Sequence, residues 1–346
     1  MASEGLESLL PTRRQVKRYN QLIKVKDMGP LNGFRVIEMA GIGPAPFACM
    51  LLADLGAEVI RVDRAVPGGG VVNAGTVMNR GKKSIAVNLK SVEGIEVVLK
   101  LVESADAIVE GFRPGVMERL GLGPDICEAR NPKMVFARMT GWGQTGPLSH
   151  AAGHDINYIS ITGALDAIGR KDSGPVPPLN LLGDFGGGSM YLVMGILSGM
   201  LEAQKSGKGQ VVDVAITDGV ISLMAMMQEF KGMGAWETGE RQNNMLDGAA
   251  HYYDTYECSD GKWISLGSIE PQFYALLIEQ TGLDLGEPGL MTQFNKADWP
   301  MYKDKITACI KTKTQAEWCD IMEGTDVCFA PVLNMDEAVQ HPHNVA

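Results

Sequence analysis

Short apolar runs alternate with longer segments of helical periodicity through the N-terminal part of the chain. The runs predicted as strands are 34–40, 58–63, 106–112 and 133–143, with a further strand beside Lys82 and Lys83. The segments predicted as helices are 47–57, 94–105 and 113–124. Strands that alternate with helices are typical of mainly parallel α/β sheets. The pattern therefore predicts a Rossmann-like large domain, with ligands near the carboxyl ends of the strands.

The C-terminal part of the chain follows a different pattern. Residues 216–231 are predicted to be helical and contain a methionine cluster, for which core packing is favoured over the lining of an adaptable acyl pocket. Residues 252–268 predict a hairpin around a Ser-Asp-Gly turn, and 270–283 predict a helix. These segments indicate three parts: an N-terminal arm at 1–28, a large domain at 29–231, and a linker with a smaller α+β domain at 232–346.

Composition narrows the class of protein. The formal charge of −10 disfavours nucleic acid as a partner, because phosphate binding needs a basic surface. The six cysteines contain no C-x-x-C pair, which fits a reducing, intracellular compartment; cytoplasm, mitochondrion and peroxisome all stay open. The apolar run from Met190 to Leu201 is too short for a membrane span. The arm at 1–28 carries acidic residues before a basic cluster, unlike a secretory or transit signal, and predicts a solvated helix face.

The first predicted strand, helix and second strand imitate a dinucleotide-binding fingerprint. Gly41 and Gly43 follow the first strand, and Asp63 ends the second strand at the expected distance. Pro46 stands where the fingerprint has Gly or Ala, and Pro44 disturbs the same loop. The sequence therefore argues against NAD as a cofactor.

Residues 141–190 collect the side chains with the strongest catalytic character. His154 and Asp155 lie where a loop becomes an apolar, helix-like run at 155–165, and Asp184 precedes a longer apolar run at 189–204. Backbone N–H groups at helix starts favour negative charge, so a developing oxyanion is stabilised there. The simpler alternative is structural, because an Asp before a helix is most often an N-cap and an isolated His is usually part of a folded core.

A cluster of cations spans the predicted sheet. On a structural interpretation, these cations lie at solvated ends of strands and helices. On a functional interpretation, some of them bind phosphate, because Arg offers a bidentate fork and Lys a mobile charge. Spacing alone does not identify the ligand. The members of the cluster are Arg61, Arg64, Arg80, Lys82, Lys83, Arg113 and Arg119.

Several motifs in order along the chain closely resemble the type III CoA-transferase (CaiB/BaiF) superfamily and, within it, the α-methylacyl-CoA racemases. The resemblance runs from about residue 29 to the last residue, and its motifs are specific in combination. They are GPLNGFRVIEMAGIGPAP, NRGKKSI, RPGVMERLGLGP, ARMTGWGQTGP, GHDINY, NLLGDFGGGS, NMLDGAAHYYDTYEC and IEPQFY.

The resemblance implies a fold, a substrate class and a set of site residues. The fold is a Rossmann-like parallel-sheet domain with a smaller α+β domain, and the substrate is a CoA thioester whose phosphates are held by cations; no metal or redox cofactor is implied. The implied catalytic residues are His154, Asp184, Glu270 and Asp155. The implied CoA-binding residues are Arg64 and Arg119, with Arg80, Lys82 and Lys83 as nearby candidates. The implied lining residues are Ile42, Gly43, Tyr158, Gly186 and Gly187.

Three functions are consistent with this resemblance. In a racemase, His154 and Asp184 exchange a proton at the α-carbon of a 2-methylacyl-CoA through an enolate, interconverting the (R) and (S) forms. In a transferase, Asp155 attacks the acyl thioester as a nucleophile. The third alternative is an inactive acyl-CoA-binding scaffold. A His before Asp155, where transferases commonly carry an aromatic residue, favours the racemase.

The family forms interlocked, ring-like homodimers, so the resemblance implies a homodimer. Relatives continue beyond the point that corresponds to Ala346 and return to the large domain. The expectation is therefore that this 346-residue chain lacks the return segment and forms a weaker dimer as given.

Overall fold

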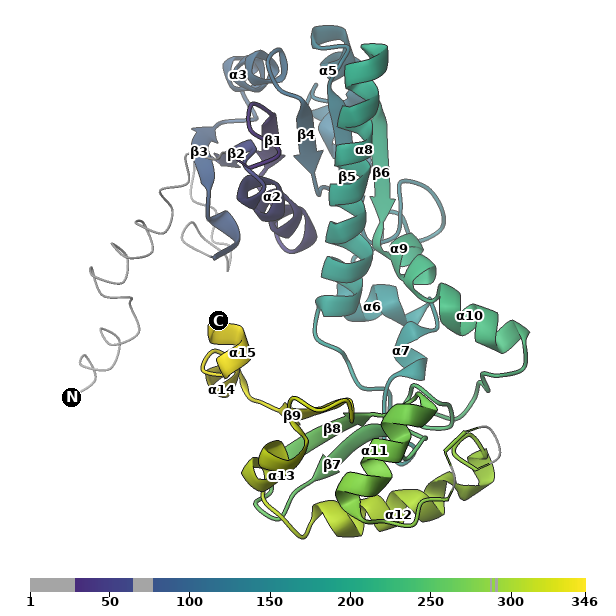
Figure 1. The fold of residues 1–346 in the computed structure, drawn as a ribbon. Helices are drawn as coiled ribbons and strands as arrows, with labels where there is room; N and C mark the ends of the chain where they lie inside the picture. Colours follow the sequence, from purple (N-terminus) through teal and green to yellow (C-terminus); the bar gives the residue numbers. More distant parts are fainter. Residues whose placement is uncertain (1–28, 65–76, 287, 290–291) are drawn as a thin grey trace, which may run out of the picture. The chain divides into compact units, whose positions relative to one another are not determined.

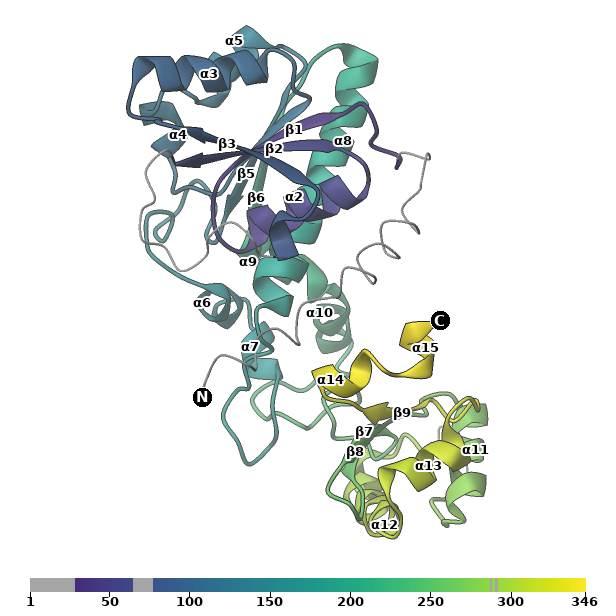
Figure 2. The same cartoon turned by 90° about the vertical axis from the view of Figure 1, so that its left-hand side faces the viewer.

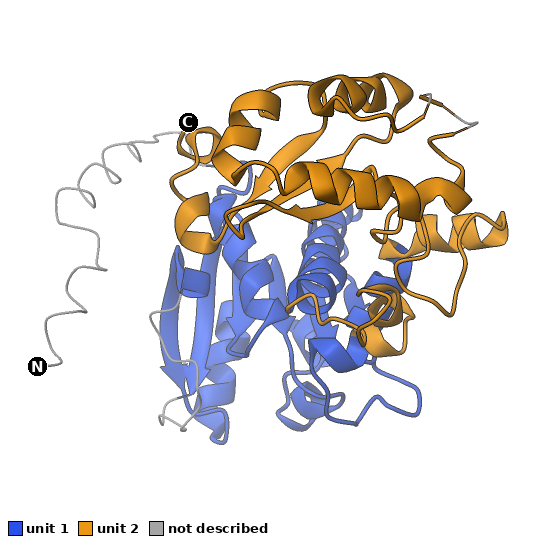
Figure 3. Ribbon diagram, turned by 90° about the horizontal axis from the view of Figure 1, so that it is seen from below, with its two compact units in different colours: residues 1–158, 180–222 blue, residues 159–179, 223–346 orange. Residues whose placement is uncertain are grey.

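The computed structural model describes residues 29–64, 77–286, 288, 289 and 292–346. The predicted arm at 1–28 lies outside the described residues. The described residues up to Tyr158, together with Asn180–Ser222, form a first compact unit; Ile159–Leu179 and Leu223–Ala346 form a second (Figure 3). This division differs from the predicted boundary at 231/232. The segment 159–179 belongs with later residues, because Arg170 pairs with Asp254 at 2.5 Å and Asp166 with Arg241 at 3.1 Å.

The first unit is built on a six-stranded sheet in the order β3-β2-β1-β4-β5-β6, with every neighbouring pair parallel (Figure 1). This is the strand order of Rossmann-type folds, so the predicted α/β class is confirmed. The strands are β1 Arg35–Met39, β2 Glu58–Arg64, β3 Lys82–Val87, β4 Ala107–Glu110, β5 Val135–Thr140 and β6 Val211–Ala215.

Helices cover both faces of this sheet (Figure 2). On one face, α3, α4 and α5 enclose a buried apolar cluster that includes Ile37, Val98 and Ile108. On the other face lie α2 and α8. The helices of this unit are α2 Pro44–Asp54, α3 Val92–Val102, α4 Val116–Arg119, α5 Pro124–Arg130, α6 Asp155–Ser160, α8 Tyr191–Ser206 and α9 Ile216–Leu223, with short turns η2 Val77–Asn79 and η3 Leu181–Met190.

Two helix starts differ from the predicted ones. Helix α2 begins at Pro44, although both prolines were expected in a loop; proline is tolerated in the first turn because its missing N–H has no partner there. The helix expected from Ser189 is preceded by a π-helical stretch, η3, and the two make one helical segment, Leu181–Ser206, of 26 residues. By length and hydropathy this segment could cross a membrane, but its packing against β5 and β6 is that of a core helix in an α/β sheet.

The second unit contains a three-stranded antiparallel sheet in the order β7-β8-β9. The hairpin predicted at 252–268 is confirmed as β7 and β8. Tyr252, Tyr274 and Trp318 are fully buried in its core. The elements are β7 Tyr253–Glu257, β8 Trp263–Gly267, β9 Phe329–Val332, α7 Ala164–Ala167, α10 Ala225–Gly232, α11 Pro271–Thr281, η4 Lys296–Asp298, α12 Trp299–Ile310, α13 Gln315–Met322, α14 Met335–Ala338 and α15 Pro342–Val345.

Candidate active site

A cavity of about 890 Å³ lies at the carboxyl ends of the central strands of the first unit. The strand order reverses between β1 and β4, and this switch point is where open α/β sheets bind ligands, because the loops from the two strands diverge there. The carboxyl ends of four strands and the residues that follow them line the cavity: Ala40–Pro44 after β1, Arg64 at the end of β2, Gly111–Pro114 after β4, and Thr140–Trp142 at the end of β5.

Two of the predicted catalytic residues, His154 and Asp184, line this cavity. His154 is exposed and immediately precedes α6, and its backbone N–H donates to the Asn157 side chain at 3.1 Å. Asp184 is not the helix cap that the sequence suggests, since η3 begins at Leu181 with Asn180 as its N-cap. A π-helical turn, a rare conformation that is frequent at functional sites, therefore carries the Asp184 carboxylate.

Asp155 directly follows His154 but is buried. It is 6% exposed and is not among the residues that line the cavity. Its Oδ2 accepts a hydrogen bond from the backbone N–H of Asp184 at 2.7 Å. The Asp155 carboxylate thus pairs with the N–H of Asp184 in the first turn of η3, although the two residues are 29 positions apart in the sequence. This hydrogen bond fixes the backbone at Asp184.

The pKa of Asp184 is raised from 3.8 to about 6. Burial is the largest cause, and the neighbouring Asp155 charge raises the pKa further; a hydrogen bond from Asn180 and the proximity of His154 oppose this. Burial and the Asp184 charge likewise raise the pKa of Tyr158. A carboxylate with a pKa near neutrality is a suitable proton acceptor and donor at physiological pH.

The approach of Asp184 to α2 requires glycine at position 43. Gly43 has φ of 75°, in the region that L-residues with side chains rarely adopt. A Cβ at this position would lie 3.3 Å from Asp184 Oδ2. Gly43, Ile42 and Tyr158 line the cavity as the sequence resemblance implies, whereas Gly186 and Gly187 do not. Gly187 is buried against α9 instead, where a Cβ would clash with Val220.

The cations divide into those at the cavity and those with structural partners. Arg64 lines the cavity and is exposed. Arg61 and Arg113, two further members of the predicted cation cluster, line it as well. Arg61 donates to Asn79 at 2.6 Å and pairs with Asp63 at 3.0 Å.

The other predicted phosphate-binding residues lie outside the cavity lining. Lys82 pairs with Glu38 at 2.5 Å and donates to the Pro46 carbonyl at 2.9 Å, and its side chain is only 2% exposed. This burial argues against the predicted contact of Lys82 with a ligand phosphate. Arg80 pairs with Asp54 and Lys83 with Glu58, both near the surface, and Arg119 is exposed on α4.

Glu270 lies in the second unit, where it is the N-cap of α11. Its side chain is exposed, and its carbonyl accepts the N–H groups of Phe273 at 3.0 Å and Tyr274 at 2.9 Å. Pro271 occupies the first helical position. The Pro-led helix start predicted from the sequence is therefore confirmed.

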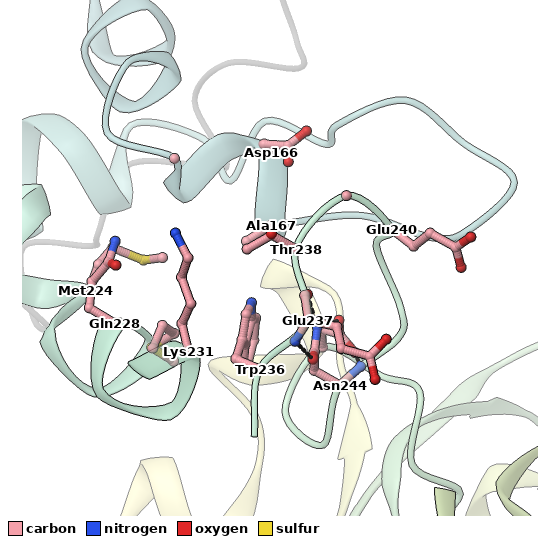
Figure 4. Close-up of a pocket in the computed structure, with 14 residues that line it drawn as sticks. Asp166, Ala167, Met224, Gln228, Lys231, Trp236, Glu237, Thr238, Glu240 and Asn244 are labelled. Carbon is pink, nitrogen blue, oxygen red and sulfur yellow. Dashed lines mark hydrogen bonds between the residues drawn. The ribbon is translucent and has the colours of Figure 1, made fainter. Parts of the chain in front are cut away.

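Met224 and Met227 of the methionine cluster line a second, smaller cavity rather than a core. This cavity has a volume of about 160 Å³ and lies within the second unit. Figure 4 shows Met224, the N-cap of α10, with Gln228 and Lys231 of α10 on one side of it, facing Ala167 and Trp236. No residue of α10 is fully buried, and Met226 is 44% exposed, so the predicted core packing of the cluster is wrong.

The fold and the cavity together define an α/β protein with a histidine and a carboxylate of raised pKa at a Rossmann switch point. The chain matches the model of CoA-transferase family III over residues 31–346, and it belongs to this family. The predicted resemblance is thus confirmed.

Named relatives and solved structures are consistent with this assignment. The chain is 46% identical to the alpha-methylacyl-CoA racemase of Mus musculus and 43% identical to that of Homo sapiens, over 91% of this chain and 80% of each relative. It is 28% identical to the succinyl-CoA:glutarate CoA-transferase of Mus musculus, over 90% of this chain and 73% of that protein. The structure of Rv3272 from Mycobacterium tuberculosis superimposes with a TM-score of 0.75 at 26% identity, covering 92% of this chain and 88% of that one.

Proposed function

We propose that the protein is a racemase that interconverts the (R) and (S) forms of 2-methylacyl-CoA thioesters. One observation carries the proposal: His154 and Asp184 line the same cavity, while the Asp155 carboxylate is buried and bonded to the Asp184 N–H. Inversion at the α-carbon needs one base on each face, because a proton leaves from one side and returns to the other. The racemases at 43 and 46% identity support the same reaction.

The proposed reaction is a proton transfer in two steps. One of the two groups removes the α-proton, giving an enolate of the thioester, and the other delivers a proton to the opposite face. Asp184, with a pKa of about 6, accepts a proton at neutral pH and returns it without a large energetic penalty. We assign stabilisation of the enolate oxygen to backbone N–H donors at the helix starts beside the cavity. The resemblance assigns Glu270 to assist His154, and the reaction needs no metal or redox cofactor.

The transferase alternative requires Asp155 as a nucleophile. A nucleophilic carboxylate must reach the thioester carbonyl, but Asp155 is 6% exposed and outside the cavity lining. The geometry of this carboxylate therefore favours the racemase. The scaffold alternative predicts binding of acyl-CoA without any turnover.

We propose that the CoA phosphates bind to Arg64 at the cavity and to Arg119 on α4. The protein carries a formal charge of −10, so it must concentrate positive charge locally to hold a polyanion. Arg113, which lines the same cavity and is exposed, adds a third guanidinium. The thioester end would then extend toward His154 and Asp184.

We further propose that the protein acts as an intracellular homodimer. Exposed apolar side chains on α8, Met194 at 57% and Leu201 at 56%, support an interface on this helix. Light scattering would measure the mass of the 346-residue chain and of a version extended with the C-terminal segment of its relatives. Monomers in both samples would contradict the dimer.

Two parallel assays separate the three functions. The protein is incubated with a single enantiomer of a 2-methylacyl-CoA, either alone or with an excess of a second carboxylic acid. A racemase forms the other epimer in both reactions, and a transferase forms a new thioester only in the second. A scaffold gives neither product. Transfer of CoA to the added acid without epimerisation would overturn the proposal.

A further inference from the structure

Behind the cavity, a buried guanidinium is held among carboxylates on the α3–α5 face of the sheet. Arg138 on β5 is 9% exposed. The sheet register places it between Glu110 on β4 and Asp213 on β6. A buried charge is costly unless it is paired and hydrogen-bonded, so this Arg is expected to organise its surroundings.

The contacts of Arg138 connect segments that lead into the cavity. Its Nη1 donates to the side chain of Gln144 at 2.9 Å, and its Nη2 donates to the carboxylate of Glu118 on α4. Its Nε lies 3.8 Å from the carboxylate of Glu110. Glu110 in turn accepts the backbone N–H of Phe112 at 2.7 Å, and Phe112 lines the cavity.

The Gln144 contact fixes the loop that leads to His154. Trp142, two residues before Gln144, packs edge-on against Tyr158 with ring centroids 4.8 Å apart. Gly141 lets the Tyr158 ring lie directly on the backbone, since a Cβ at this position would overlap the ring. The Tyr158 hydroxyl donates to the carbonyl of Gly153, the residue before His154. A continuous set of contacts therefore runs from Arg138 through the 141–153 loop to His154.

We propose that Arg138 and Gln144 are positioning residues that hold the 141–153 loop, and with it His154, in the geometry for proton transfer. This inference rests on the proposed racemase function for its kinetic consequence. Asp184 is fixed separately, by Asp155 and by its place in η3, so loss of the Gln144 contact should disturb one base and spare the other.

The charge state of the cluster supports this role. Three carboxylates, those of Glu110, Glu118 and Asp213, surround one guanidinium. Burial raises the pKa of Glu110 to about 7 and also raises the pKa of Asp213. Partial protonation of these two carboxyl groups lowers the net negative charge around Arg138.

The test compares two substitutions of Gln144. Gln144→Met keeps the length but removes the acceptor for Arg138, whereas Gln144→Glu keeps the length and the acceptor. Gln340→Met, at an exposed position of the second unit, is the matched control. The measured quantity is the rate of α-proton exchange in D₂O, started separately from each enantiomer of a 2-methylacyl-CoA.

We expect Gln144→Met to slow exchange from the enantiomer whose proton His154 removes by about 10- to 100-fold, because a small displacement of a catalytic group has an effect of this size. Exchange from the other enantiomer should change much less. His154→Ala identifies which enantiomer is which. Gln144→Glu should recover part of the lost rate, because it keeps the acceptor for Arg138 but replaces the amide that faces Asp213 with a carboxylate. An equal slowing from both enantiomers, or no slowing at all, would overturn the positioning role.

A second measurement separates this inference from the proposed function. Amide hydrogen exchange of the peptide covering 141–154 should be faster in Gln144→Met than in the parent and in Gln340→Met, and intermediate in Gln144→Glu. If the parent chain exchanges no α-proton from either enantiomer, the racemase function fails, while faster amide exchange still supports the loop anchor. Unchanged amide exchange in Gln144→Met would reject the anchor whatever the activity.

Discussion

Asp155 provides a sharp test of the site, because the racemase and the transferase assign it different tasks. In the structure its carboxylate does two things: it accepts the Asp184 N–H at 2.7 Å, and its charge raises the pKa of Asp184. Asp155→Asn removes the charge but keeps a side-chain oxygen of the same length as an acceptor. The substitution therefore separates the electrostatic effect from the hydrogen bond.

The size of the effect follows from the pKa of Asp184. The rise from 3.8 to about 6 corresponds to at most about 3 kcal/mol between the two protonation states, less after solvent screening of this partly exposed group. Burial is the largest cause and persists in the variant, so the pKa of Asp184 should fall but stay above 3.8. At pH 5, about a tenth of the parent molecules carry ionised Asp184, and the variant should carry a larger fraction.

The assay is the pH dependence of kcat/KM for epimerisation, measured from the enantiomer whose proton Asp184 removes. Because Asp184 must be ionised to accept that proton, the rate falls with decreasing pH around pH 6 in the parent and around a lower pH in Asp155→Asn. The rate at the plateau should change by less than about tenfold, since neither base is removed. Asp184→Asn, as the control, should abolish epimerisation at every pH. Complete loss of activity in Asp155→Asn, with a correctly folded chain, would refute the reasoning.

Three further predictions concern stability and ligand binding. Burial raises the pKa of Glu110 from 4.5 to about 7, so the folded state keeps a proton that the unfolded state loses, and the free energy of unfolding should fall by up to about 3 kcal/mol as the pH rises between these values. Urea unfolding of Glu110→Gln should show a smaller fall with pH, and a fall equal to that of the parent would contradict the prediction. His251 is fully buried, and burial lowers its pKa from 6.5 to about 3, so the free energy of unfolding should fall by up to about 5 kcal/mol as the pH falls from 6.5 toward 3. In His251→Gln the free energy of unfolding, measured with urea, should depend less on pH between pH 7 and pH 4. Arg64→Ala and Arg119→Ala should each weaken CoA binding in calorimetry, and binding to the parent should weaken with added salt. The control Arg130→Ala, which breaks ion pairs with Glu96 and Glu103, should leave CoA binding unchanged. Undiminished CoA affinity in the Arg64/Arg119 double variant would rule out the assignment of these two residues to the phosphates.

The sheet was predictable because its strands are short apolar runs between helices, and the signal is local. Strand β6 and helix α5 were not predicted. In β6, Val211–Ala215, the polar Asp213 interrupts the apolar run, and its partner Arg138 lies 75 positions earlier in the chain. Long-range pairing of this kind leaves no local pattern. The excursion of 159–179 into the second unit was missed for the same reason.

The candidate site was predictable in its residues but not in its contacts. The motifs point to His154, Asp155 and Asp184, and the structure places two of them at one cavity. The sequence could not show that the Asp155 carboxylate bonds the Asp184 N–H, because the partners are separated by 29 residues and by the second-unit segment 159–179. The sequence also could not distinguish the role of Lys82, which is buried against Glu38, from that of Arg64, which lines the cavity. Both residues belong to the same cluster of cations along the predicted sheet.

The central claim is that His154 and Asp184 move a proton at the α-carbon. The most direct measurement incubates the protein with each enantiomer of a 2-methylacyl-CoA in D₂O and follows deuterium at the α-carbon together with the configuration by mass spectrometry and chiral separation. The account predicts solvent deuterium in the epimer formed from either enantiomer, and loss of epimer formation in both His154→Ala and Asp184→Ala. Epimer formed without solvent deuterium, or full epimerisation in either variant, would contradict it.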